Sequence, residues 1–104
     1  MTTTFRIPTP LHSRLMPHLF PGDLDEHGAV ITAGISRSAR GTRLLARELF
    51  LARDGVDYVP GQHGYRCLTT DFVMRVSDHC DNENLCYFAV HNHRGDVRVA
   101  FSQD

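Results

Sequence analysis

The chain has 104 residues, a length that supports one hydrophobic core and gives no reason to expect a second domain. Its hydrophobic fraction of 41% is ordinary for a globular protein, and its formal net charge of -1 argues against a nucleic-acid-binding protein. No stretch approaches the roughly 20 apolar residues of a membrane span, and Met1–Arg6 lacks the features of a signal peptide. We therefore expect a cytoplasmic protein that binds neither membranes nor nucleic acid.

The first half of the chain predicts a helix and a buried strand. The helix runs from about Leu11 to Leu19, with Thr9 as its N-cap and Pro10 at its first position. After a turn at residues 20–23, residues 28–35 form a short apolar run bounded by glycines, which is typical of a buried strand. Glu26 stands just before this strand.

The middle of the chain predicts extended structure. Residues 36–41 are polar and indicate a turn. Residues 43–53 fit either a helix or a strand, and we prefer a strand because alternate residues divide into two faces. Residues 56–59 predict another extended piece, and residues 60–64 a loop.

A second helix and a strand lead to two histidines. Thr69 or Thr70 predicts an N-cap, followed by an apolar stripe at helical spacing that ends at Cys80. Residues 85–90 are strand formers that deliver the chain to His91. A turn is expected at residues 94–96, and Ser102 is placed as the N-cap of a helix that would follow.

These elements predict an α+β fold, α/β in its layering, with a mixed sheet of about five strands flanked by helices. Three cysteines without a C-x-x-C pair predict free thiols rather than a disulfide framework or a zinc knuckle. Cys80 and Cys86 are expected to pack in the interior, and His18 and His27 to be solvated.

His91 and His93 are the candidate metal ligands. Residues two apart on an extended backbone project to the same face, roughly 6.6 Å apart, so two imidazoles can share one cation. A catalytic zinc site needs a third protein ligand and an open position for water. Glu26 is either a carboxylate that takes the proton of that water or a solvated acid beside Asp23, with Glu48 as the alternative base.

The order of these parts resembles a known family. His91-Asn92-His93, a short insert and then Phe101-Ser102-Gln103-Asp104 is similar to the signature of the JAB/MPN/JAMM zinc metalloproteases, which reads His-x-His, a short insert and Ser-x-x-Asp. Glu26 before a small apolar strand resembles the family's separate upstream glutamate. The resemblance covers roughly residues 11–104 and implies the cytidine-deaminase-like architecture of that family.

The resemblance also implies roles. His91 and His93 become Zn²⁺ ligands, Glu26 the general base and Ser102 a stabiliser of the oxyanion. The family's acidic ligand stands three residues after the serine, one position beyond Asp104, so the third ligand is either Asp104 or the residue after it. We accordingly expect a single domain, residues 1–104, that lacks its C-terminal part and is inactive if the third ligand is missing.

The function implied is a metallopeptidase or isopeptidase that hydrolyses an amide bond at the tail of a ubiquitin-like protein. Family relatives also suggest an activating-enzyme-like partner, and a homodimer would bury a sheet face left uncovered. The alternative is a RadC-like or non-catalytic JAB domain that acts as a protein-interaction module. An HNH nuclease does not fit, because its histidines are spread over a hairpin and a helix and are not two residues apart.

Overall fold

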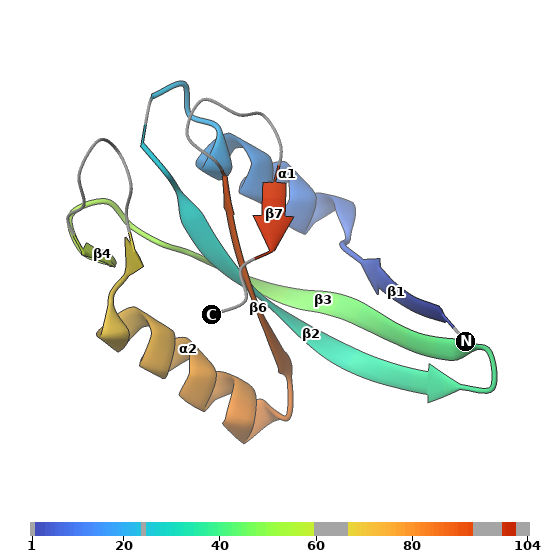
Figure 1. Cartoon of the computed structure of the whole chain (residues 1–104). Helices are drawn as coiled ribbons and strands as arrows, with labels where there is room; N and C mark the ends of the chain where they lie inside the picture. The colour runs from blue at the N-terminus through green and yellow to red at the C-terminus, as the bar shows by residue number, and fades with distance from the viewer. Residues whose placement is uncertain (1, 24, 60–66, 93–98, 102–104) are drawn as a thin grey trace.

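The computed structural model describes residues 2–23, 25–59, 67–92 and 99–101. In these ranges the chain forms two helices, α1 (Thr9–Leu19) and α2 (Thr70–Glu83), and seven strands (Figure 1). The strands are β1 (Thr2–Arg6), β2 (Gly28–Ser38), β3 (Gly41–Leu51), β4 (Tyr58–Val59), β5 (Cys67–Leu68), β6 (Cys86–Asn92) and β7 (Val99–Phe101). None of the helices described is long and apolar enough to cross a membrane.

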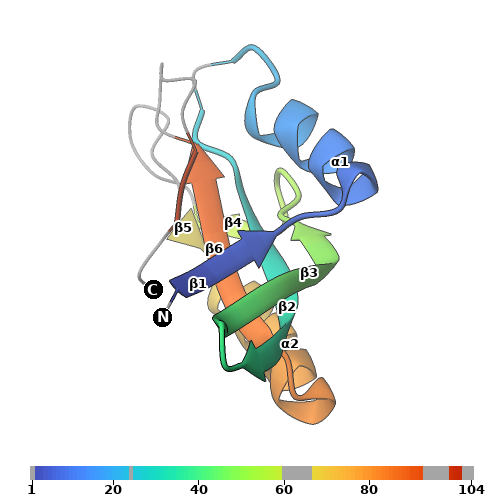
Figure 2. The ribbon, with the colours of Figure 1, turned by 90° about the vertical axis from the view of Figure 1, so that its right-hand side faces the viewer.

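Five of the strands form one mixed sheet in the order β1-β3-β2-β6-β7. β1 runs parallel to β3, and the other neighbours are antiparallel. β4 and β5 form a separate two-stranded piece. The sheet is curled, and β2 and β3 extend as a long hairpin beyond Cys86, the first residue of β6 (Figures 1 and 2). The mixed α+β sheet of about five strands is therefore confirmed.

The two helices cover opposite faces of this sheet, which explains the unbroken apolar run in β2. Ala29 and Ile31 pack with α1, whereas Val30 packs with α2. A strand that is buried on both faces needs apolar residues at successive positions, without alternation. Beyond Gly34 the helices no longer cover the strand, and Ile35 is exposed.

Helix α1 matches the prediction in extent but begins differently. The carbonyl of Pro8 accepts bonds from the amides of Leu11 and His12, so Pro8 is the N-cap, and Thr9 is the first helical residue. The expected N-cap at Thr9 is therefore wrong, and no side chain caps this end. Pro17 lies inside the helix, which continues to Leu19. Leu15 and Leu19 are buried against the sheet.

Helix α2 follows the prediction closely. Thr69 is its N-cap, and the Oγ1 of Thr69 accepts a bond from the amide of Phe72 at 3.2 Å. Asn84 ends the helix in the left-handed conformation, with φ of 55°. Phe72, Val76 and Cys80 form the buried stripe, so the core position of Cys80 is confirmed. Burial raises the pKa of the Cys80 thiol.

Several strands differ from expectation. β2 continues to Ser38, so the predicted turn at residues 36–41 shortens to a tight connection before Gly41. β4 contains only Tyr58–Val59, because Val56 lies in a turn. β1 and β7 were not predicted at all. β1 is an edge strand with exposed threonines, and its apolar contact is the Phe5 ring, which meets the Phe88 ring edge-on at 5.0 Å.

Candidate functional site

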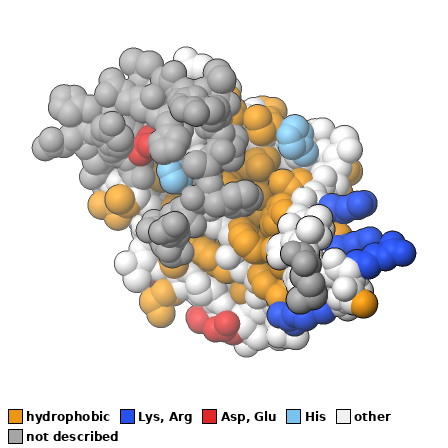
Figure 3. All heavy atoms as spheres, turned by 45° about the vertical axis from the view of Figure 1, so that its right-hand side comes forward, with side chains coloured by type: hydrophobic (Ala, Val, Ile, Leu, Met, Phe, Trp, Pro, Cys, Tyr) orange, Lys and Arg blue, Asp and Glu red, His pale blue; other side chains and the backbone are white. Residues whose placement is uncertain are grey.

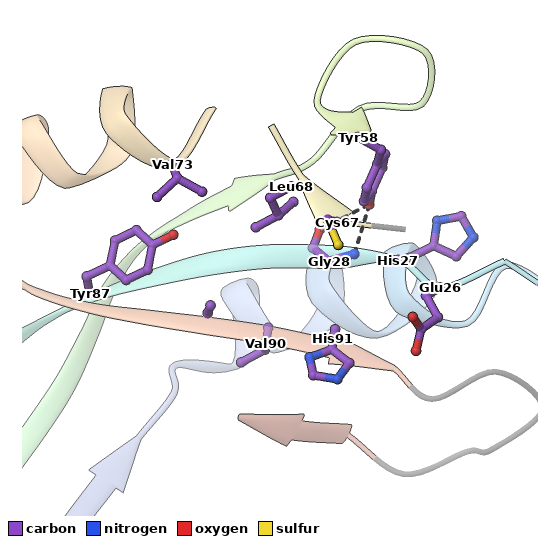
Figure 4. A pocket seen from close by; sticks show the side chains of 11 residues that line it. Glu26, His27, Gly28, Tyr58, Cys67, Leu68, Val73, Tyr87, Val90 and His91 are labelled. Atoms are coloured by element: carbon purple, nitrogen blue, oxygen red, sulfur yellow. Dashed lines mark hydrogen bonds between the residues drawn. The ribbon is translucent and has the colours of Figure 1, made fainter. Parts of the chain in front are cut away.

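A pocket of about 260 Å³ opens where the first residues of β2 meet the end of β6 (Figure 4). β4 and β5 and the start of α2 form its other walls. Its lining is mostly apolar with a few polar groups at one end, and consists of Glu26, His27, Gly28, Tyr58, Cys67, Leu68, Val73, Tyr87, Ala89, Val90 and His91. Such a composition is typical of small-ligand and substrate sites.

Glu26 and His91 lie at the same end of this pocket, although they are far apart in the sequence (Figure 4). The sheet register explains the approach, because Gly28 is paired with His91 and Glu26 precedes Gly28 by two residues. Both side chains are half-buried. Tyr87 and Val73 lie at the opposite end of the pocket. The sheet thus brings together two of the residues that the sequence assigns to the site.

Asn92 clamps the segment that carries Glu26. The Oδ1 of Asn92 accepts a bond from the amide of His27, and the amide of Asn92 donates to the His27 carbonyl at 3.2 Å. Asn92 is buried, so both bonds are shielded from water. This pairing extends the contact between β2 and β6 by one residue. The sequence analysis assigned Asn92 no role. Strand alternation does indicate its burial, because the side chain that follows His91 on the strand projects to the opposite face of the sheet.

Tyr58 fixes the same segment from the other side. Its hydroxyl accepts a bond from the buried amide of Gly28 at 2.8 Å. The hydroxyl lies 3.4 Å from both the Gly28 and the Ala52 carbonyls, to either of which it can donate. No sequence pattern indicated this contact, because it depends on the position of β4 beside the start of β2.

Asp57 holds the turn that presents Tyr58. Its Oδ2 accepts bonds from the amide of Arg53 at 2.8 Å and from the Arg53 Nε at 3.1 Å, and its carbonyl accepts from the Thr69 amide at 2.8 Å. Burial acts to raise the pKa of the Asp57 carboxyl, but the bonds from Arg53 outweigh burial and hold that pKa below its usual range. The charged carboxylate therefore holds the turn before β4, and the backbone carbonyl of Asp57 ties that turn to the start of α2.

His27 and His18 are not solvated as expected. His27 is 4% exposed, and its Nε2 donates to the Oδ1 of Asp23 at 2.8 Å. The Nε2 of His18 donates to the carbonyl of Gly28 at 2.9 Å. The prediction was wrong because a carboxylate binds the buried His27 ring and a backbone carbonyl binds the half-buried His18 ring near the start of β2. These contacts further restrain the residues beside Glu26.

Glu48 does not lie at this pocket. The Oε1 of Glu48 accepts bonds from the Nε2 of His79 at 2.7 Å and from the Thr32 hydroxyl at 3.0 Å. The bond from His79 is the main reason why the pKa of Glu48 is lowered, and the bond from Thr32 adds to it. The alternative base is therefore engaged elsewhere, under α2. Cys86, expected to be packed, is half-buried in β6.

The remaining candidate residues, His93, Ser102 and Asp104, lie outside the described part of the chain. Within residues 2–23, 25–59, 67–92 and 99–101, no group of three or more His, Cys, Asp or Glu side chains could hold a metal ion. The pocket nevertheless carries the His91 imidazole at the same end as the Glu26 carboxylate, which is the donor chemistry that a zinc hydrolase needs for a ligand and a base. The three cysteines are free.

Comparison of the chain with protein-family models, with curated proteins and with solved structures finds no significant match. The function therefore has to be argued from the residues of the pocket. The fold alone would not identify the function, because one architecture supports many unrelated activities.

Proposed function

We propose that the chain is a zinc-dependent metallopeptidase of the JAB/MPN/JAMM type, with the cytidine-deaminase-like architecture of that family. Its reaction is hydrolysis of an amide or isopeptide bond at the tail of a ubiquitin-like protein. One observation carries the proposal: Glu26 and His91 line the same end of one pocket, in the sequence order of the family's glutamate and first histidine.

The metal would be held by His91, His93 and an acidic third ligand, for which Asp104 is the candidate in this chain. The imidazole of His91 borders an apolar pocket, and such surroundings strengthen the interaction of a cation with its ligands. When bound, Zn²⁺ polarises the substrate carbonyl and lowers the pKa of water to about 7. Loss of the third ligand would weaken metal binding and abolish activity.

Glu26 acts as general base and then as general acid. A carboxylate oxygen of Glu26 takes a proton from the attacking water and gives it to the nitrogen of the leaving amine, so that proton and electron pair balance. The half-buried position of Glu26 and the fixed backbone at His27 and Gly28 orient this carboxylate toward the pocket. The Ser102 hydroxyl would donate a hydrogen bond to the developing oxyanion.

The experiment is hydrolysis of a ubiquitin-like C-terminal amide by the full-length protein in the presence of Zn²⁺. We expect Glu26→Gln to retain zinc and to lose at least ~100-fold in kcat. Glu48→Gln is the matched control, because it removes a strand carboxylate bound to His79 and Thr32 outside the pocket. Both variants are checked for folding by circular dichroism.

Full activity in Glu26→Gln would exclude Glu26 as the base. A wild-type protein that binds a ubiquitin-like protein but never cleaves it would instead favour the non-catalytic interaction module. Cleavage that persists after complete removal of zinc would reject the metallopeptidase assignment itself.

A further inference from the structure

Positive charge is concentrated on arginines at the side of the sheet that β1, β2 and β3 form. Residues 1–22 and 27–47 contain no aspartate or glutamate, yet they carry Arg6, Arg14, Arg37, Arg40, Arg43 and Arg47. Figure 3 shows Arg side chains gathered at one end of the molecule, with no acidic side chain visible among them. The formal net charge of the chain, -1, gives no sign that these segments are basic.

Four of these side chains share one surface. Arg6 lies on β1, Arg40 in the turn of the β2–β3 hairpin, and Arg43 and Arg47 on β3. Arg6, Arg40 and Arg43 line a groove of about 140 Å³ together with Thr2, Thr4 and Ser38. We call Arg6, Arg40, Arg43, Arg47 and the Leu45 between them the arginine face.

In the part of the chain that the structure describes, no acidic side chain pairs with this surface. Among the described residues, no carboxylate lies within ion-pair distance of the arginine face, whereas Arg53 and Arg75 each approach Asp57, at 3.1 and 4.0 Å. All four arginine residues are exposed. Like charges held close together repel one another, and an anionic partner removes that repulsion.

An exposed apolar residue stands inside the arginine face. Leu45 is 39% exposed, and it is in register with Arg6 on one side and with Gly34 on the other. Gly34 leaves room for the Arg47 guanidinium, whose Nε lies only 2.9 Å from the position that a Cβ would take. The guanidinium groups thus surround an apolar contact point.

β1 also presents an open strand edge. It is the outermost strand of the sheet and pairs with β3 alone within the described residues, and Thr2–Thr4 are exposed. Such an edge can accept an extended polypeptide as an additional strand. A second copy of this chain is disfavoured as that strand, because its own arginines would be brought against these.

We propose that the arginine face binds an acidic, extended segment of a partner protein. Its carboxylates would form bidentate bonds with the guanidinium groups, one apolar side chain would contact Leu45, and its backbone would pair with β1. A nucleic acid would satisfy the arginines but neither the strand edge nor Leu45. The surface lies beside residues 34–38 of β2, roughly 20 to 30 Å from the Gly28 end that borders the pocket, so it is independent of the proposed hydrolysis.

The test is fluorescence anisotropy with a labelled synthetic peptide in which glutamates alternate with valines around one central leucine. We expect binding that weakens with salt and that falls at least ~10-fold in the double variant Arg6→Gln, Arg43→Gln. Arg40→Gln, in the hairpin turn, provides a second variant that cannot disturb strand pairing. Arg14→Gln is the matched control, because Arg14 is an equally exposed arginine on α1.

Each of the following results would overturn the proposal. The first is equal binding of a peptide with glutamine in place of every glutamate. The second is tighter binding of oligothymidine than of the acidic peptide, which would indicate a nucleic-acid surface. The third is an equal loss in the Arg14→Gln control, or no binding of the acidic peptide by the wild type.

Discussion

Replacement of Tyr58 by phenylalanine removes one oxygen atom from the support of the pocket. The ring stays, so the apolar surface buried by residue 58 hardly changes. What is lost is the acceptor of the Gly28 amide, which bonds to the Tyr58 hydroxyl at 2.8 Å in a buried position. The contacts of the hydroxyl with the two carbonyls are longer, at 3.4 Å, and contribute less.

An unsatisfied buried amide costs about 1–3 kcal/mol. With a urea m value of about 1–3 kcal/mol/M for a protein of this size, Tyr58→Phe should lower the midpoint of urea unfolding by roughly 1 M at unchanged m. Hydrogen exchange gives a local readout, because the Gly28 amide should lose protection more than the amides of α2.

The control is Val59→Ala, on the same strand but exposed to 49%. It should change stability by less than about 0.5 kcal/mol. An unchanged midpoint in Tyr58→Phe, with the Gly28 amide still protected, would refute the view that this hydroxyl anchors the start of β2.

Three further predictions concern the clamp, the core and pH. Asn92→Ala leaves the His27 amide without its acceptor and should destabilise the protein by about 1–3 kcal/mol in urea unfolding. An unchanged midpoint of urea unfolding would contradict the role of Asn92 as a clamp. Phe72→Ala should cost about 3–5 kcal/mol by the same measurement, because Phe72 is 2% exposed; a loss below about 1 kcal/mol would contradict its place in the core. The lowered pKa of Asp57 means that its charged form stabilises the fold above the ordinary Asp pKa of about 3.9, and that this stability is lost as pH falls through the lower folded pKa. The temperature of thermal unfolding should therefore vary less between pH 7 and pH 2 in Asp57→Asn than in the wild type. Parallel pH profiles of the two proteins would show that Asp57 does not contribute this pH dependence.

The elements that the sequence predicted well are those whose residues settle the structure locally. Thr69 caps α2 through its own side chain, and the stripe of Phe72, Val76 and Cys80 gives the helix one buried face. β3 was ambiguous by pattern. Residues 43–53 also fitted a helix, but their alternation into two faces favoured a strand, and the strand is confirmed as β3.

The elements that were missed depend on distant partners. The threonines and Phe5 of β1 favour extended backbone, but the strand is mostly exposed and has no apolar alternation, so its place in the sheet depends on pairing with β3. His27 is buried by contacts with Asp23 and with Asn92, neither of which sequence spacing reveals. Pro8 replaces Thr9 as the N-cap of α1 because a backbone carbonyl, and not a side chain, starts that helix.

The candidate site also contains residues that the sequence predicted and residues that it did not. Glu26 and His91 were chosen from the motif, and the register of β2 and β6 brings them to one pocket. The supports of that pocket, Tyr58 and Asn92, were not foreseen because their roles arise only when strands far apart in the sequence meet. His93, Ser102 and Asp104 stay predictions.

The most direct test of the metal centre follows the histidine rings by two-dimensional ¹H–¹⁵N correlation during titration of the full-length protein with Zn²⁺. The ring nitrogens of His91 should shift and reach saturation at one equivalent, while those of His12, exposed on α1, stay unchanged. In Glu26→Gln the same shift should persist, because Glu26 moves the proton and does not bind the metal. A His91 ring that ignores one equivalent of zinc, or that shifts only together with His12, would contradict the account.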